Sequence, residues 1–147
     1  MTDLPNLPSE DSKRFIAVLN KKIELGRLLN ALGHMAAGIV ARVGNTDALC
    51  FLEYLDETNG IHPCISHFPF IVLKADNSNK IKKIREEAIA RNVPFTDFTE
   101  TMTIGTSSAQ LEATKSVSTE SHEYFGICMF GDTDTLREFT GKLSLFR

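Results

Sequence analysis

Short apolar runs rich in β-branched and aromatic residues alternate along this chain with longer stretches of helical periodicity. A short run of this kind is typical of a buried strand, whereas apolar residues three or four positions apart are typical of a helix that buries one face. Such alternation favours an α/β domain, because each helix leads the chain back to the same sheet. No other feature of the sequence restricts the fold as strongly.

The expected strands are short, apolar and four in number: 13–20, 68–75, 93–100 and 122–131. Helices are expected in the segments that flank them: 26–43, 76–92 and 132–143. With helices on both faces of a four-stranded mixed sheet, the domain becomes a three-layer α/β/α sandwich. The segment 101–121 is polar, so its structure stays open and part of it is expected to be helical.

The first helix carries an unusual polar row. The stretch "GRLLNALGHMAAGIVARVGN", residues 26–45, is largely apolar, yet Arg27, Asn30 and His34 fall within about 60° of one another on a helix. Arg27 lies in the first turn, where free N–H groups favour an anion over a cation. A nearby anionic group, from the protein or from a ligand, would resolve this conflict. The alternative, which periodicity alone favours, is a core histidine bonded to a backbone carbonyl beside a solvated arginine.

Residues 50–66 are expected to form a hairpin that extends from the core. Asn59-Gly60 would supply the two positive φ angles of a type I′ turn. The piece "HPCISH" brings His62, Cys64 and His67 together, but a zinc site normally has four ligands and no second pair is present. The piece "GTSS" lacks the lysine and the other glycine of a phosphate-binding loop. We therefore expect no metal and no cofactor.

The length of 147 residues suits a single domain, here residues 13–147 after a mobile tail at 1–12. The chain has no run of 18 apolar residues, so no membrane partner is expected. Its start lacks the apolar region of a signal peptide, and its three cysteines are widely spaced. A cytoplasmic location is the expectation, because a disulfide framework needs paired cysteines and an oxidising compartment.

The charge is unevenly distributed. The net charge is −3, and a dedicated nucleic-acid-binding domain is usually basic. Residues 13–91 contain 12 Lys and Arg against 8 Asp and Glu, while residues 96–138 contain 2 against 8. A local basic face in the first part therefore remains open, but tRNA is disfavoured as a partner without being excluded.

Three stretches of the chain resemble type II peptidyl-tRNA hydrolases: "VLNKKIELGRLLNALGHMAAG", "IVLKADNSNKIKKIREEAIARNVPFTDFTE" and "EYFGICMFGDTDTLREFTGKLSLFR". Together they cover most of the chain from Lys13 on, apart from 44–66 and 101–121. The closer resemblance is to an uncharacterised bacterial branch, the domain-of-unknown-function family numbered two thousand, through "LNALGHMAAG", "HP-x-IS" and the "L-R" ending. The resemblance implies a type II peptidyl-tRNA hydrolase-like fold with a hairpin insertion.

The resemblance also implies site residues. Gly26 and His34 match the glycine and the histidine of the hydrolase motif, whereas Arg27 replaces its lysine and Ala31 replaces its glutamine. The hydrolases' aspartate falls near Glu100. Because these positions differ, peptidyl-tRNA hydrolysis is kept as the alternative function.

A hydrolytic site would need a group that transfers a proton, a carboxylate that orients it and a cation for the oxyanion or phosphate. We therefore expect a polar pocket at the start of the first helix, with His34 and Glu100 as catalytic residues. The expected ligand-binding residues are Gly26, Arg27, Asn30, Asp97, Thr103 and Thr106. The expected ligand is a small anionic or acyl molecule, either hydrolysed or only bound.

Two further expectations concern partners. A non-catalytic binding or interaction domain is the other alternative, in which the helix is retained for packing. A homodimer is expected, because the resembled hydrolases are often dimers and the apolar 44–66 insertion could bury surface between two chains.

Overall fold

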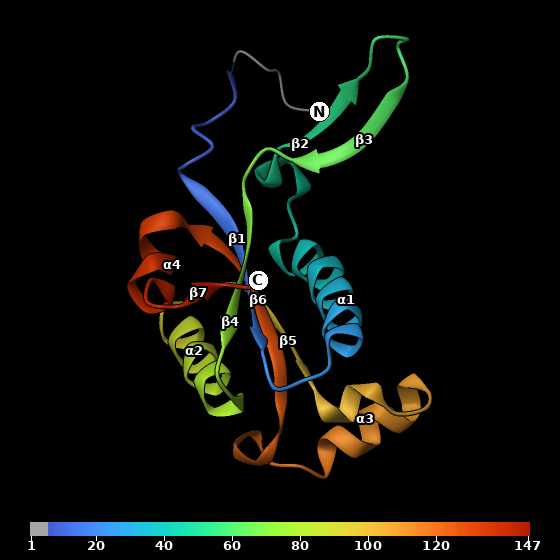
Figure 1. Cartoon of the computed structure of the whole chain (residues 1–147), viewed down its shortest axis with the longest axis vertical. Helices are drawn as coiled ribbons and strands as arrows, with labels where there is room; N and C mark the ends of the chain where they lie inside the picture. Colours follow the sequence, from blue (N-terminus) through green and yellow to red (C-terminus); the bar gives the residue numbers. More distant parts are fainter. Residues whose placement is uncertain (1–5) are drawn as a thin grey trace.

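In a computed structural model, the described residues 6–147 form a sheet with helices on both faces (Figure 1). The strands of the main sheet, in spatial order, are β5 (Phe95–Thr99), β6 (Tyr124–Asp132), β1 (Lys13–Asn20), β4 (Phe70–Ala75) and β7 (Ser144–Leu145). The helices are α1 (Leu25–Val43), α2 (Ser78–Ala90), α3 (Ser107–Lys115) and α4 (Thr133–Thr140). A separate hairpin contains β2 (Phe51–Leu55) and β3 (Ile61–Ser66), and short 3₁₀ helices are η2 (Thr46–Leu49), η3 (Glu100–Thr103) and η4 (Thr119–Ser121).

The main sheet is mixed. β1 pairs in parallel with β4 and antiparallel with β6, and the pairs β5–β6 and β4–β7 are antiparallel. The mixed α/β class predicted from the sequence is thereby confirmed. The expected number of four strands is wrong, because within residues 6–147 the main sheet has five. The additional strand, β7, spans two residues and is too short for the alternation by which a strand is detected in a sequence.

The central strand β1 is buried on both faces, which explains its continuous apolar run. Phe15, Ala17 and Leu19 belong to the half of the core beneath α1. Ile16 and Val18 belong to the other half, which α2 and α4 cover. The alternation of one short strand thus divides the core into two layers.

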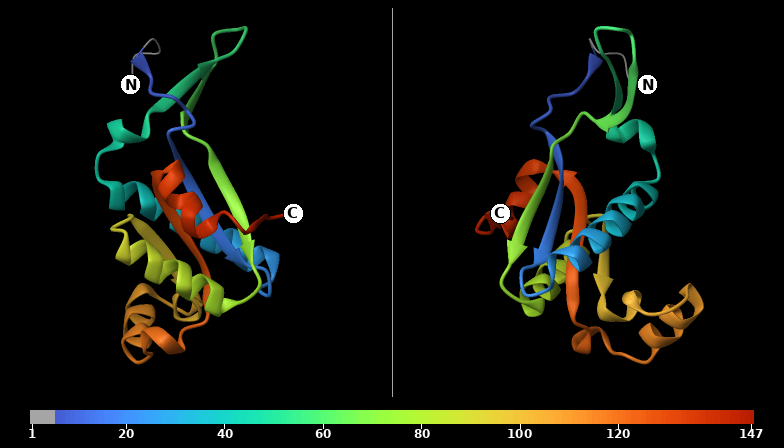
Figure 2. Two further views of the ribbon diagram at one scale, coloured as in Figure 1. Left: turned by 90° about the vertical axis from the view of Figure 1, so that its left-hand side faces the viewer. Right: turned by 45° about the vertical axis from the view of Figure 1, so that its right-hand side comes forward.

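Helix α1 packs on the first face through four buried side chains: Leu28, Ala31, Met35 and Ile39. It lies chiefly over β5 and β6 (Figure 2). Gly126 of β6 permits this close approach, because a Cβ atom there would lie 2.8 Å from Cε of Met35. Since α1 is displaced toward β5, one of its flanks faces α3 and the other borders an open stretch of β1 and β4.

The hairpin extends from the body, as predicted (Figure 1), but its turn is not type I′. Asn59 has a φ of 63°, whereas Gly60 does not have a positive φ. The Asn59 N–H donates to the Asp56 carbonyl (3.0 Å) and the Asp56 N–H to the Gly60 carbonyl (3.0 Å), the pattern of a three-residue loop with one left-handed residue. The Asp56 carboxylate explains the difference, because it accepts from the N–H groups of Thr58 (2.9 Å) and Gly60 (2.8 Å) and stabilises this longer loop.

The segment before β1 contacts the body over part of its length. The expected mobile tail spans 1–12, and residues 1–5 of it lie outside the described residues. The Pro8 carbonyl lies 2.7 Å from Nε2 of His67. Thr133 donates its hydroxyl to the Asp11 carbonyl (2.6 Å) and its N–H to the Ser12 carbonyl (3.0 Å). Residues 8–12 are therefore attached to His67, just after β3, and to the start of α4.

The polar segment 101–121 holds η3, α3 and η4, so the expected partial helicity is present. α3 has no buried residue. Its attachment to the end of β5 is a row of hydroxyl groups, in which Thr101 Oγ1 lies 2.9 Å from Thr99 Oγ1 and 2.8 Å from Thr114 Oγ1. This row fixes α3 beside the first half of α1 (Figure 2). Within residues 6–147, no helix combines the length and apolar character that crossing a bilayer requires.

Candidate functional site

A cleft separates α1 from the segment that contains η3 and α3. It comprises two hollows of about 580 Å³ and about 400 Å³. His34 of α1, Met102 of η3 and Gln110 of α3 line both hollows, so the two form one continuous site. We call this site the polar cleft.

The polar row of α1 faces the polar cleft. Arg27 and Asn30 line the smaller hollow, and His34 lies where the two hollows meet. The His34 ring is exposed and stacks on Phe98 of β5, with 5.9 Å between the ring centroids and 23° between the planes. Its nitrogens have no hydrogen-bond partner in the part of the chain that the structure describes. The alternative of a core histidine bonded to a backbone carbonyl is therefore wrong.

The smaller hollow lies at the amino-terminal end of α1. The guanidinium of Arg27 lies over the Phe125 ring, 4.9 Å from its centroid, a favourable cation–π arrangement. The N-cap residue, Glu24, provides no side-chain hydrogen bond to the first turn. Glu24 itself lines the hollow, as does Gly26. This end of the cleft thus presents one cation, uncapped N–H groups and one carboxylate.

Asp97 lines the larger hollow together with His34, but its carboxylate is directed away from the polar row. Its neighbours along β5, Thr96 and Phe98, face α1: the Thr96 hydroxyl donates to the Met35 carbonyl (2.9 Å), and Phe98 joins the core beneath the helix. Asp97 therefore points to the opposite face, as strand alternation requires. There its carboxylate accepts a hydrogen bond of 2.7 Å from Nε of Arg85 on α2.

Glu100 is likewise occupied elsewhere. Its carboxylate accepts from the Glu123 N–H (2.8 Å) and lies 3.3 Å from Nδ1 of His122. The side chain of His122 is largely buried. Glu100 thus joins η3 to the start of β6, and the carboxylate expected to orient His34 is directed at a different histidine.

The two threonines of the expected site do line the polar cleft. Thr103 lines the smaller hollow and donates its hydroxyl to the Glu100 carbonyl (2.7 Å). Thr106 lines the larger hollow and, as the N-cap of α3, accepts from the Ala109 N–H (3.2 Å). Thr106 retains its hydroxyl proton as a donor to a ligand.

Sequence reasoning missed Met102 and Gln110. Gln110 contributes an amide opposite His34, with both donor and acceptor capacity. A signal for it exists: Thr106 is a good N-cap, and a helix that begins after it places residue 110 one turn later. Met102 gives the cleft an apolar wall, which neither periodicity nor charge could have indicated.

Both histidines of the piece "HPCISH" have other partners: His62 lies against Asp56 and His67 against the Pro8 carbonyl. Nε2 of His62 lies 3.0 Å from Oδ2 of Asp56, and this hydrogen bond, followed by bonds from Gly60 and Thr58, lowers the pKa of Asp56 to about 2. Within residues 6–147, no group of three or more His, Cys, Asp or Glu side chains is arranged to hold a metal ion. The groups that line the polar cleft are a guanidinium, an imidazole, amides, hydroxyls and carboxylates.

Comparison with solved structures identifies a similar fold. The protein of unknown function Atu0240 from Agrobacterium tumefaciens strain C58 superimposes with a TM-score of 0.79, over 92% of this chain and 98% of that chain. The two are 19% identical, so the likeness shows the fold alone. No curated protein matches the chain. A family model described as "Protein of unknown function (DUF2000)" matches residues 13–147, as the sequence resemblance led us to expect, and the chain therefore belongs to that family.

Proposed function

We propose that this chain binds a small anionic molecule in the polar cleft, through a carboxylate or phosphate group placed at the start of α1. A single observation supports this best: Arg27, Asn30 and His34 line one cleft, and its narrower end contains uncapped N–H groups of the helix. These groups favour an anion together, because the helix dipole and the guanidinium have the same sign.

The surroundings restrict the ligand further. Glu24 lines the same hollow as Arg27, so a bare polyanion meets repulsion there. A small molecule that carries a hydrogen-bond donor beside its anionic group satisfies both side chains. Its remaining part would extend past His34 toward Met102 and Phe98, where an acyl group finds apolar contact.

Hydrolysis of an acyl or phosphate-bearing ligand is the second candidate. It is favoured by the exposed His34 ring, because an unpartnered imidazole nitrogen can accept a proton from a water molecule. Asp97 and Glu100, however, are held by Arg85 and by His122 and the Glu123 amide. Binding is therefore better supported than catalysis, and a non-catalytic role is the simpler form of this function.

Two finer features belong to the same proposal. The type II peptidyl-tRNA hydrolase-like form of the three-layer fold rests on the sequence resemblance and on helices that cover both faces of a mixed sheet. The cytoplasmic location rests on three cysteines that are all unpaired, as expected in a reducing compartment.

Two-dimensional NMR titration tests the site directly. Inorganic phosphate, acetate and N-acetylglycine serve as probes, and saturable shifts are expected at the amides of Gly26, Arg27 and Gln110. The substitution Arg27→Gln should weaken binding by about tenfold, the usual effect of one charge-assisted hydrogen bond. Arg42→Gln, in the last turn of the same helix, is the matched control and should leave affinity unchanged.

The outcomes separate the candidates. If none of the three probes shifts these amides in the millimolar range, the anion site at α1 is refuted. If binding is present, incubation with aryl esters and aryl phosphates distinguishes the two functions. Turnover that His34→Ala abolishes would promote hydrolysis above simple binding.

A further inference from the structure

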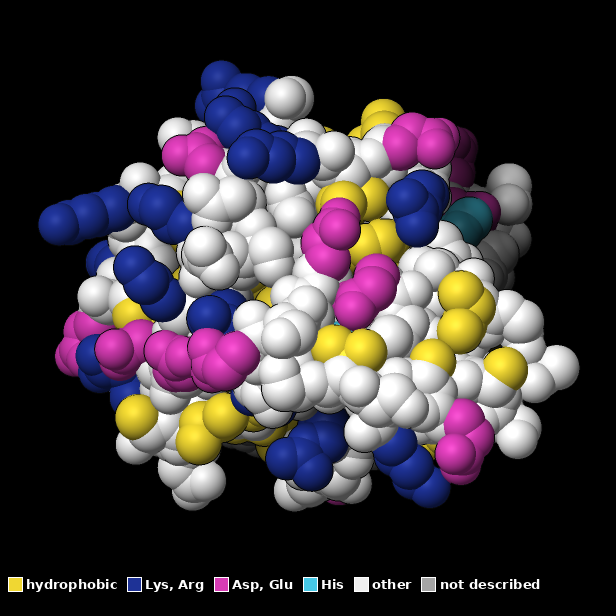
Figure 3. Space-filling model, turned by 90° about the horizontal axis from the view of Figure 1, so that it is seen from below, with side chains coloured by type: hydrophobic (Ala, Val, Ile, Leu, Met, Phe, Trp, Pro, Cys, Tyr) yellow, Lys and Arg dark blue, Asp and Glu magenta, His cyan; other side chains and the backbone are white. Residues whose placement is uncertain are grey.

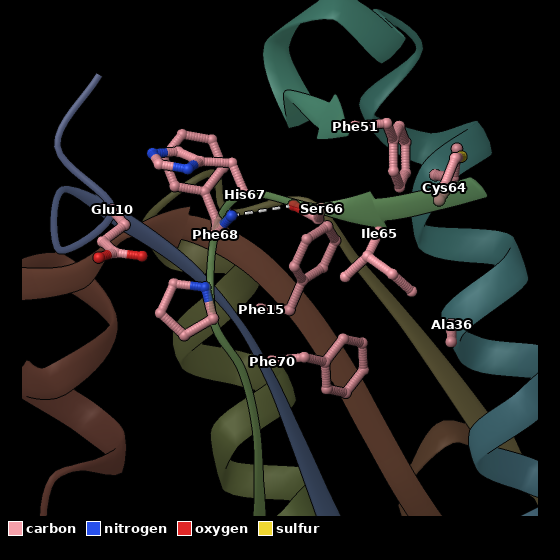
Figure 4. Close-up of a pocket in the computed structure, with 12 residues that line it drawn as sticks. Glu10, Phe15, Ala36, Phe51, Cys64, Ile65, Ser66, His67, Phe68 and Phe70 are labelled. Carbon is pink, nitrogen blue, oxygen red and sulfur yellow. Dashed lines mark hydrogen bonds between the residues drawn. The ribbon is translucent and has the colours of Figure 1, made fainter. Parts of the chain in front are cut away.

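On the other flank of α1 lies an apolar groove lined by Phe15, Ala36, Val40, Phe51, Ile65 and Phe70 (Figure 4). The sheet, the helix and the hairpin each supply one wall, and the volume is about 550 Å³. Among the described residues that line it, Glu10 is the one carboxylate. We propose that a second copy of this chain covers this groove, in a two-fold dimer in which the hairpin of each protomer packs against the groove of the other.

The exposed apolar surface continues beyond the groove. Along α1 the row of Ala36 and Val40 extends toward the amino-terminal end, where Leu29 is exposed. On the hairpin, Leu55, Ile61 and Ile65 are exposed as well. A two-stranded hairpin is marginally stable in water unless a further strand, a helix or a partner covers it. The hairpin and the flank of α1 therefore both lack the contact that a partner would supply.

The area is appropriate for a stable dimer. Ile65 and Phe70 line the groove. Six large apolar side chains of α1, the hairpin and β4 leave roughly half of their surface in water: Leu25, Leu29, Leu55, Ile61, Ile65 and Phe70. At about 200 Å² for each large side chain they expose on the order of 600 Å², before the groove walls are added. A standard interface buries about 800 Å² on each partner.

The shape favours a second copy over an unrelated protein. The same chain carries a protruding apolar hairpin and an apolar recess, so a two-fold axis satisfies both features twice. The root of the hairpin is already fixed, because Ser66 Oγ donates to the Leu49 carbonyl (2.8 Å) and accepts from the Phe68 N–H (3.1 Å) (Figure 4). A hairpin whose base is already ordered loses less conformational entropy on association.

Light scattering on the full chain gives the first test. We expect a species of twice 16.3 kDa that dissociates on dilution. Ile65→Asp should raise the dissociation constant by at least about 100-fold, because each interface then buries two unpaired carboxylates. The control is Leu111→Asp on α3, where the side chain is 65% exposed compared with 60% for Ile65. This variant should remain dimeric.

Thiol labelling of the unmodified chain gives an independent test. Cys64 is exposed and lines the groove, whereas Cys50 and Cys128 are buried, and burial raises the pKa of the Cys128 thiol to about 12. The rate of Cys64 labelling by a maleimide should fall at least tenfold as the chain is concentrated into its dimeric range, and it should not fall for Ile65→Asp.

Three results would overturn the proposed interface: a 16.3 kDa species at every concentration up to the millimolar range, a dimer that survives Ile65→Asp, or Cys64 labelling that is independent of concentration. In the first case, saturable binding of the neutral dye Nile red by the monomer would assign the groove to a small apolar ligand instead.

Discussion

The two flanks of α1 have opposite chemistry although one helix supplies both. Toward α3 the helix presents Arg27, Asn30 and His34 to the polar cleft. Toward β4 it presents Ala36 and Val40 to the apolar groove. The apolar groove (about 550 Å³) and the larger hollow of the polar cleft (about 580 Å³) are of similar size, so the difference between them lies in the side chains and not in the space available.

This difference shows that only a small part of the surface of α1 is needed to pack the helix on the sheet. The buried stripe of Leu28, Ala31, Met35 and Ile39 fixes the position of α1 on the sheet. The two flanks contribute little to that packing and are free to meet other molecules. A polar flank beside an apolar one, separated by a fully buried stripe, allows one helix to serve a ligand and a protein partner at the same time.

The largest effect is expected from a substitution in the buried stripe, which holds both flanks of α1 in place. Met35→Ala should lower the free energy of unfolding by about 3 kcal/mol, because it leaves a cavity between α1 and Gly126. Both ligand binding and dimerisation should weaken, since neither flank keeps its position. Urea unfolding measures the loss, and Arg42→Ala on the exposed side of the helix should cost only a few tenths of a kcal/mol. A Met35→Ala variant as stable as the parent would show that the flanks do not depend on this stripe.

A smaller effect is expected from a substitution in the hairpin, which borders the apolar groove and not the polar cleft. In Gly60→Val a Cβ atom would lie 2.6 Å from Oδ2 of Asp56, so the carboxylate must leave its position in the loop. The loss of its bonds should destabilise the hairpin locally, so amide exchange at Thr58 should become roughly fivefold faster. Ligand binding in the polar cleft should stay unchanged. Gly33→Ala, at a position on α1 with open space around it, is the matched control.

Acid should also destabilise the hairpin, through the protonation of Asp56, which does not line the polar cleft. The pKa of Asp56 is lowered from 3.8 to about 2, chiefly by its bond to His62. Because the pKa is depressed in the folded state, the stability that this carboxylate contributes is present above pH 3.8 and is lost as the pH falls through about 2. Amide exchange at Thr58 and Gly60, measured across this window, should therefore accelerate toward low pH once intrinsic exchange is corrected. Asp56→Asn should remove that acceleration; if it persists, another group is responsible.

The smallest effect is expected for the cleavage of peptidyl-tRNA, which would have to bind at the polar flank. The end of the molecule seen in Figure 3 intersperses Asp and Glu side chains among Lys and Arg, without one continuous basic surface. Ala31, which stands where the resembled hydrolases have glutamine, is fully buried and offers nothing to a substrate. We therefore expect little or no release of a labelled peptide from peptidyl-tRNA at low salt, and no difference for His34→Ala. Cleavage that requires His34 would promote the alternative function.

Much of the fold could be read from local patterns, because burial imposes a period of two on strands and 3.6 on helices. For the same reason, Arg27, Asn30 and His34 share one edge of α1 and line one cleft in the structure. The same rule governs Asp97, because the alternation of Thr96, Asp97 and Phe98 places the carboxylate on the face away from α1. Glu100 had no such signal, because it follows the strand and its direction depends on where η4 and β6 bring His122.

The sequence by itself determined the α/β class, the extent of α1 along the chain and the edge of that helix on which its polar row lies. These follow from side-chain periodicity within single elements. The tertiary structure alone decided what faces that edge, and that the opposite flank is an open apolar groove. Both depend on contacts between segments far apart in the chain: a row of threonine hydroxyls that fixes α3, and a displacement of α1 toward β5 that Gly126 permits. Such contacts leave no period in the sequence, because each depends on the meeting of two distant segments.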